Sequence, residues 1–307
     1  MTLIRKIAAS QDGTVTLTQA NAAGLTVHEV HRLCRSGRWR RLARAGYLVD
    51  ADRYAEIPRR VRIRAAVASF GRSAAAVLDT AAELHGIAGT RRTEAIHVSL
   101  PGPAVRPSRD TDPAVIIHQL TIGAAQLCDV AGIPVTRPVR TVADIIVRAD
   151  RFTAVSVLDS AVNRQVVTAE EFAMIPGLIR GRRGAVAARG YLAECDGRAQ
   201  SPLETRLRLR CVDGRVAPDV LQHEVRDRDG CLLGVGDLAW LAARLIGEAD
   251  GREVHGTPEA VYQDRWRQNR IVNAGWRILR FTWDDTMRPD YIPFVVRNAL
   301  AASPLPR

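Results

Sequence analysis

Hydrophobic positions near the N-terminus recur every three or four residues, a spacing that predicts short amphipathic helices. The first of these helices covers residues 2–10. Thr18 is expected to cap a second helix over residues 19–23, and Thr26 a third over residues 27–35. Both assignments rest on the threonine hydroxyl, which can accept a hydrogen bond from a free N–H group of the first helical turn.

Two short strands follow the third helix, at residues 39–43 and 46–49. Together with the turn at Gly24, this order predicts a winged helix-turn-helix. Basic side chains are concentrated on the third helix and the two strands, where they would bind DNA bases and phosphates. The alternative interpretation is a solvated polar face. The candidate DNA-binding residues are His28, His31, Arg32, Arg35, Arg38, Arg40, Arg41 and Arg44.

The middle of the chain mixes helical and strand patterns and is interpreted as one small α/β connecting domain. A helix is expected over residues 73–84, and strands over residues 95–100 and 115–118. The histidines of this region are not at metal-ligand spacing, so they are interpreted as core or surface residues: His85, His97 and His118.

The C-terminal third begins with a capped helix, in which Ser201 is the cap and Pro202 the first helical residue. Glu204 completes a capping box, which requires no metal. The pattern then predicts three strands, a basic helix, a fourth strand and a final helix. The whole chain is therefore expected to be a multidomain α/β protein with domains at 1–57, 58–195 and 196–307, the last a mixed sheet flanked by helices.

Three carboxylates are expected to meet at one end of this predicted sheet. Asp237 lies inside an apolar run, and Glu248 and Asp250 stand two apart on the next strand, so they face the same way. Carboxylates at such density repel one another unless a cation lies between them, and oxygen ligands suit Mg²⁺ or Mn²⁺. The alternative is that arginines neutralise these acids, since an unpaired charge at Asp237 would be costly.

The charge balance favours a polyanionic partner, with nucleic acid ahead of a membrane surface. The chain carries a net charge of +11, and Lys6 is its only lysine. Arginine favours planar, bidentate contacts to phosphate and guanine.

Cysteine usage and hydropathy point to a reducing, cytoplasmic environment. The five cysteines are scattered and odd in number, which argues against a disulfide framework or a zinc site. No apolar stretch reaches the roughly 18 residues of a membrane span, and no signal peptide is evident.

The N-terminal part resembles AbiEi-type antitoxins. The resemblance rests on Gly24-Leu-Thr, on the run from Arg40 to Val49, and on the Arg-Thr-Val-Ala-Asp pattern that ends at Asp144. It implies a winged helix joined to a second domain, double-stranded DNA as a partner, and a toxin-type partner.

The C-terminal part resembles restriction-endonuclease-like domains of the PD-(D/E)xK superfamily, close to very-short-patch-repair endonucleases. The matching pieces are Ser201 to Arg206, Asp237 to Trp240, Gly247 to Gly251, Asp264 to Arg270 and Gly275 to Phe281. By this resemblance Asp237 and Glu248 would be metal ligands, and Glu204 an added catalytic carboxylate. Asp250 stands where the superfamily usually has a lysine, so His255 or Arg252 would have to replace that lysine.

Two functions remain open at this stage. The first is a DNA-binding protein that cuts or nicks DNA with a divalent metal, using Glu204, Asp237, Glu248, Asp250 and His255. The second is a non-catalytic regulator of the AbiEi antitoxin type, in which the nuclease fold is a relic used for dimerisation or for grip on DNA. RNA binding is a third interpretation, against which the predicted winged helix argues.

Overall fold

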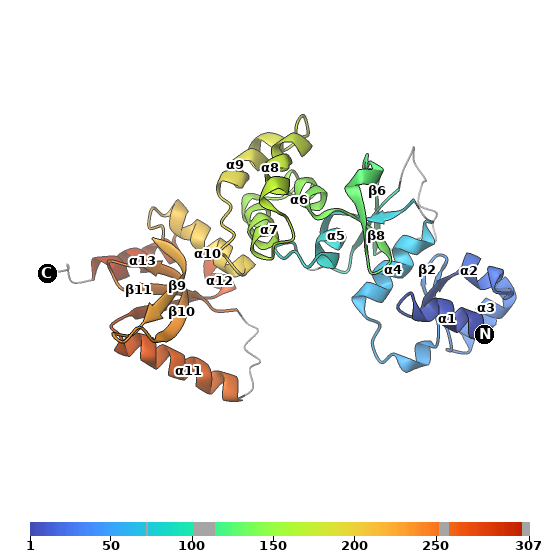
Figure 1. Ribbon diagram of the computed structural model, residues 1–307, viewed down its shortest axis with the longest axis horizontal. Helices are drawn as coiled ribbons and strands as arrows, with labels where there is room; N and C mark the ends of the chain where they lie inside the picture. Colours follow the sequence, from blue (N-terminus) through green and yellow to red (C-terminus); the bar gives the residue numbers. More distant parts are fainter. Residues whose placement is uncertain (72, 92, 101–113, 252–257, 303–307) are drawn as a thin grey trace. The chain divides into compact units, whose positions relative to one another are not determined.

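The computed structural model describes residues 1–71, 73–91, 93–100, 114–251 and 258–302. Within these ranges the chain is a mixed α/β protein with thirteen α-helices and three β-sheets, which confirms the expected multidomain α/β class (Figure 1). It divides into two compact units: Met1–Ile145 with Glu170–Arg180, and Ile146–Ala169 with Gly181–Arg307. The domain boundaries expected after residues 57 and 195 stay predictions.

The first unit begins with three helices and a small antiparallel sheet of order β1-β3-β2. Its core contains the fully buried side chains of Ile4, Val30 and Trp39. The elements are α1 (Thr2–Ala9), β1 (Thr14–Thr16), α2 (Leu17–Ala22), α3 (Val27–Arg35), β2 (Arg40–Ala43) and β3 (Gly46–Leu48), followed by a 3₁₀ turn at Ala51–Arg53.

The start of α2 corrects the sequence-based expectation. Thr16, rather than Thr18, is the cap: its hydroxyl accepts from the Gln19 N–H, and the Gln19 side chain accepts from the Thr16 N–H. The reciprocal bond requires Glu or Gln three residues after the cap, which Thr16 has and Thr18 does not. The expected Thr26 cap of α3 is confirmed, with Glu29 in the reciprocal role.

The same unit contains a five-stranded sheet of order β6-β5-β4-β8-β7. A single helix was expected over residues 73–84, but the structure has a strand followed by a helix. The buried alanines of this segment pair with β5 and β8, and this tertiary pairing outweighs the helix preference of alanine. The elements are α4 (Arg59–Ser69), β4 (Ala75–Ala76), α5 (Leu78–Leu84), β5 (Ile96–Ser99), β6 (Val115–His118), a 3₁₀ turn at Ala124–Gln126, β7 (Leu127–Val130), β8 (Ile133–Thr136), α6 (Pro138–Ile146) and α8 (Ala169–Leu178).

Helix α4 packs against both sheets of the first unit. Towards the small sheet the approach is close: a Cβ atom at Gly46 would lie 2.8 Å from the Ala65 carbonyl oxygen. Towards the larger sheet, buried Arg64 donates to the carbonyls of Ala131 and Gly132 while it also binds the Asp12 carboxylate at 2.7 Å. One guanidinium therefore ties together the turn before β1, α4 and the turn between β7 and β8.

The second unit is built on a four-stranded sheet of order β12-β11-β10-β9, in which only the β11–β12 pair is parallel. Helices α10 and α13 pack on one face and α11 on the other (Figure 1). The elements are α7 (Arg151–Asn163), α9 (Ala185–Ala193), α10 (Pro202–Asp213), β9 (Val220–Arg226), β10 (Leu232–Trp240), β11 (Leu245–Ala249), α11 (Pro258–Asn273), β12 (Arg277–Phe281), α12 (Trp283–Thr286) and α13 (Tyr291–Ala301). From α10 onward, and except for the short α12, this order agrees with the sequence-based expectation.

A buried ion pair joins α7 to α10. Asp159 is 1% exposed and accepts from the Arg208 guanidinium at 3.0 Å and from the Thr205 hydroxyl at 2.7 Å. The N–H group of Asp196 donates to the other carboxylate oxygen at 2.7 Å. The carboxylate is thus surrounded by donors, as a buried charge requires.

Removing this carboxylate should destabilise the second unit strongly. Asp159→Ala leaves the Arg208 charge buried without its partner, so the free energy of unfolding should fall by about 3–5 kcal/mol. Urea unfolding followed by tryptophan fluorescence measures this change. The exposed Asp229→Ala is the control and should shift stability by less than about 0.5 kcal/mol. An equal, small effect of both substitutions would show that the buried pair contributes little.

Candidate functional site

All eight residues predicted to bind DNA lie on the surface of the first unit. His28, His31, Arg32, Arg35, Arg38, Arg40, Arg41 and Arg44 are each exposed. Helix α3 buries Val30 completely, so its histidines and arginines are left facing outward. Strand β2 is an edge strand of the small sheet, and Arg40 and Arg41 lie on it next to an irregularity in its pairing with β3.

The positive charge of this surface is uncompensated. Between His28 and Arg44 there are six arginines and one carboxylate, Glu29. Glu29 caps α3 by accepting from the Thr26 N–H at 2.8 Å, a bond that lowers the pKa of Glu29. Among the ion pairs between described residues, none involves any of these six arginines. Their guanidinium groups are available to an external anion.

A cavity of about 750 Å³ in the second unit brings together several of the predicted catalytic carboxylates. Asp237 on β10 and Glu248 on β11 come from paired strands, and both line it with Asp250. Asp264, Arg265, Arg267 and Arg280 are the other charged residues of its wall.

Glu248 is held by two arginines. Its side chain is 8% exposed, with Arg267 at 2.9 Å from one carboxylate oxygen and Arg280 at 3.1 Å from the other. Arg280 also lies 2.6 Å from Asp264 and 3.7 Å from Asp250. Burial acts to raise the pKa of Asp264, but the bond from Arg267 and the nearby arginine charges outweigh it and lower the pKa. Guanidinium groups therefore neutralise these acids.

Asp237 and Glu204 belong to a second network. Asp237 accepts from the Ala249 N–H at 2.8 Å and lies 3.5 Å from the Gln222 amide nitrogen. Burial raises the pKa of Asp237, because it has no direct ion pair to offset desolvation. Gln222 also donates to buried Glu204 at 2.8 Å. The uncharged Gln222 amide thus lies between the carboxylates of Asp237 and Glu204.

The capping role expected for Glu204 is confirmed in part. Ser201 accepts from the Glu204 N–H at 3.2 Å, as expected. In the reverse direction, however, the Glu204 carboxylate accepts from the Gln200 N–H at 2.9 Å, one residue before the cap. The bond to Gln222 draws the carboxylate towards the sheet, which accounts for this shift.

The donor set does not fit a divalent cation as arranged here. Both Glu248 oxygens face guanidinium groups, and Asp237 is engaged separately. Within the described residues, no group of three or more His, Cys, Asp or Glu side chains is placed to hold a metal ion. His255 and Arg252, the proposed substitutes for a lysine, lie outside the described residues. The Mg²⁺ or Mn²⁺ site stays a prediction.

Four residues of this cavity region were not identified as functional from the sequence: Gln222, Asp264, Arg267 and Arg280. Arg280 meets Glu248 because β12 pairs with β11 in parallel, with Glu248 opposite Arg280. No local pattern reveals this register, since the two residues are separated by the whole of α11. The sequence indicated only that α11 is basic, and this did not show which residue Arg267 would contact.

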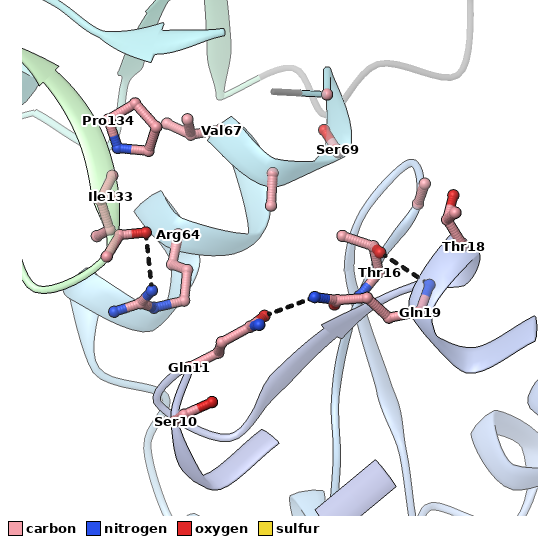
Figure 2. Close-up of a pocket in the computed structure, with 14 residues that line it drawn as sticks. Ser10, Gln11, Thr16, Thr18, Gln19, Arg64, Val67, Ser69, Ile133 and Pro134 are labelled. Atoms are coloured by element: carbon pink, nitrogen blue, oxygen red, sulfur yellow. Dashed lines mark hydrogen bonds between the residues drawn. The ribbon is translucent and has the colours of Figure 1, made fainter. Parts of the chain in front are cut away.

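A second cavity, of about 720 Å³, lies in the first unit between the start of α2 and α4 (Figure 2). Several of its polar wall groups are engaged with one another or with the backbone. Gln19 donates to Gln11 at 3.3 Å, the Ser69 hydroxyl donates to a backbone carbonyl, and Arg64 binds Asp12 and two carbonyls. This wall therefore gives no clear indication of a ligand.

Two substitutions in the cavity lined by Asp237, Glu248 and Asp250 should change the free energy of unfolding in opposite directions. Glu248→Gln removes the buried carboxylate that Arg267 and Arg280 share and leaves them only the more exposed acids Asp264 and Asp250, so the free energy of unfolding should fall by about 1–3 kcal/mol. Asp237→Asn removes a charge that burial disfavours, so stability at pH 7 should rise by about 1 kcal/mol.

The Asp237→Asn gain should depend on pH. Because the pKa of Asp237 is raised in the folded state, its contribution to stability is present below the unfolded pKa and is lost as pH rises through the folded pKa. The gain should therefore vanish on acidification, in thermal unfolding compared between pH 4 and pH 8. Equal losses from both substitutions at pH 7 would contradict the assignment.

Among the described residues, no helix is both long and apolar enough to cross a membrane.

The family models that match this chain are consistent with the basic surface on α3 and β2. Residues 3–47 match the family described as "Transcriptional regulator, AbiEi antitoxin", and residues 74–194 match "AbiEi antitoxin C-terminal domain". Proteins MT2308 and Rv2248, from two strains of Mycobacterium tuberculosis, are each 33% identical over 227 residues, or 74% of this chain and 81% of the relative. The crystal structure of the Rv2827c protein from the same species is 18% identical, with a TM-score of 0.45 over 73% of this chain and 86% of that one. The chain belongs to the AbiEi antitoxin family of transcriptional regulators.

Proposed function

We propose that this protein represses transcription by binding double-stranded DNA through α3 and the β2–β3 hairpin, used as a winged helix-turn-helix. The observation that carries the proposal is the exposed group of six arginines that have no carboxylate partner among the described residues. Each such arginine can neutralise a phosphate, which supplies sequence-independent affinity.

The arrangement of elements supports a division of roles within this surface. Helix α3 follows α2 through a turn in which Gly24 has a φ of +89°, as in a helix-turn-helix. His28 and His31 lie in the N-terminal half of α3, which meets base edges when a recognition helix enters the major groove. Arg40 and Arg41 on the edge strand would hold the flanking phosphates.

For the second unit we propose an endonuclease-like fold that has kept its acids in a structural role. The mixed sheet flanked by helices and the positions of Asp237 and Glu248 support the resemblance in fold. The ion pairs of Glu248 with Arg267 and Arg280 support a role in holding α11 and β12 to the sheet. On this basis DNA is bound and not cut.

The antitoxin family suggests a cognate toxin, and we propose that the DNA target lies upstream of an operon that encodes both proteins. Repression would then fall when the protein is depleted. A homodimer would present two copies of α3 to a palindromic site.

Neutralising the edge-strand arginines should weaken binding and reduce its salt dependence. Arg40→Gln/Arg41→Gln should lower affinity for duplex DNA about tenfold or more and reduce the slope of log affinity against log salt by about 1.8. Fluorescence anisotropy with a labelled duplex, at several salt concentrations, measures both values.

The matched control is Lys6→Gln/Arg53→Gln, which removes the same charge from exposed positions outside α3 and the hairpin. It should leave the slope close to the wild-type value. If the two double variants lose affinity equally, the binding surface lies elsewhere.

A further inference from the structure

Three arginines surround one aromatic ring in the second unit. The guanidinium carbons of Arg206 and Arg210 on α10 lie 4.4 Å and 4.6 Å from the centroid of the Phe152 ring, and that of Arg151 lies 5.7 Å away. Such cation–π contacts fix the positions of flat guanidinium groups.

The three arginines differ in their carboxylate partners. Arg151 is neutralised by Glu194 at 2.6 Å and by Asp213 at 2.7 Å. Neither Arg206 nor Arg210 takes part in an ion pair between described residues.

Arg206 and Arg210 are nevertheless held in place by α12, which lies beside α10 (Figure 1). The Nε–H of Arg206 donates to the Thr286 hydroxyl at 3.0 Å, and the Nε–H of Arg210 donates to the Thr286 carbonyl at 2.8 Å. These bonds orient both guanidinium groups. The terminal nitrogens of Arg210, and one of those of Arg206, make no hydrogen bond to other described residues.

The guanidinium groups of Arg206 and Arg210 both pack against the Phe152 ring, and two neighbouring positive charges favour the binding of an anion. Burial lowers the pKa of Arg206, and the positive charge of Arg210 lowers it further, whereas Asp150 acts in the opposite direction. Asp150 is itself engaged in capping α7, where it accepts from the Thr153 N–H at 3.1 Å and from the Thr153 hydroxyl at 2.9 Å. An external anion would relieve the remaining repulsion.

The rim of this arginine pair carries two exposed apolar side chains. Trp283 is 46% exposed, with Arg206 at 5.3 Å from its ring centroid, and Met287 is 56% exposed, with its sulfur 3.3 Å from Arg206. A half-exposed tryptophan beside a pair of oriented guanidinium groups suits a nucleotide, whose phosphate and base would bind side by side. An acidic peptide would use the arginines but not the flat indole surface.

We propose that Arg206 and Arg210 bind a phosphodiester group of single-stranded nucleic acid, with Trp283 as the stacking surface for an adjacent base. A single strand fits because its bases are free to stack on a side chain. This site is independent of the α3 surface and would let the second unit hold a displaced DNA strand or a transcript.

The test uses the full-length protein with Arg40→Gln/Arg41→Gln, so that the proposed duplex-binding surface is weakened in every sample. Binding of labelled twelve-nucleotide oligo-dT and oligo-U is followed by anisotropy at several salt concentrations. Adding Arg206→Gln/Arg210→Gln should weaken binding about tenfold or more and lower the salt slope by about 1.4. Preference for one oligonucleotide identifies DNA or RNA as the strand.

The control is Arg189→Gln/Arg215→Gln, which removes the same charge from exposed positions of the same unit. It should change neither the affinity nor the slope. Arg206→Lys/Arg210→Lys keeps the charge and should retain the slope while weakening affinity, because lysine lacks the bidentate fork. Melting temperatures of all variants establish that the fold is kept.

Trp283→Leu provides a second test, which does not depend on the folding of the arginine variants. It should weaken oligonucleotide binding about fivefold or more, through loss of one stacked base. Equal oligonucleotide affinity in the Arg206/Arg210 variant and its control would overturn the proposal, as would an unchanged affinity in Trp283→Leu. Binding of a labelled poly-glutamate peptide that is lost in the Arg206/Arg210 variant, with oligonucleotide binding unaffected, would instead assign the site to an acidic protein.

Discussion

Pairing between arginine and carboxylate is the constraint on which both compact units depend. The chain has 44 basic and 33 acidic residues, so its basic groups cannot all be paired one to one with acids. Several of the carboxylates form ion pairs with arginines in the interior of the two units. Asp12 binds Arg64 where three segments of the first unit meet, and Asp159 binds Arg208 between α7 and α10. Glu248 is likewise held between Arg267 and Arg280. A nearly fully buried charge, whether the guanidinium of Arg64 or Arg208 or the carboxylate of Glu248, is costly without an opposite charge, which explains why these acids have a structural role.

Two groups of arginines without a carboxylate partner among the described residues lie at the places to which we assign binding. On α3 and β2 they are exposed, and Glu29, the one acid in the sequence between His28 and Arg44, caps the helix. Beside Phe152 they are half-buried and oriented by Thr286. The first arrangement suits the regularly spaced phosphates of a duplex, and the second suits one phosphate next to an unstacked base. A family of transcriptional regulators is consistent with the first assignment, while the second is specific to the residues of α10 and α12.

Local chemistry in the sequence was enough to place most elements and the basic surface. The Thr26 cap was identified from its hydroxyl at the start of an amphipathic run, and the Ser201 cap from Pro202 and Glu204 after it. The arginines stood out because they are concentrated on the predicted third helix and the two strands that follow it. The strand at Ala75–Ala76 was missed because alanine favours a helix until neighbouring strands compete for its backbone. The Glu248–Arg280 contact was missed because it depends on a parallel register set across α11. The sequence therefore indicated that Asp237, Glu248 and Asp250 lie together, as they do around one cavity, but gave no basis for choosing between a metal and arginine as their partner.

We propose that the protein binds DNA at a defined site without cutting it. The measurement to make is hydroxyl-radical footprinting of the DNA upstream of its own gene, with and without prior incubation in Mg²⁺ or Mn²⁺. We expect a discrete protected segment that is the same in all three conditions, and an intact DNA backbone in parallel samples that receive the protein and metal but no radical reagent. Metal-dependent strand breaks that disappear in Glu248→Ala would contradict it and would make the carboxylates of β10 and β11 a nuclease site.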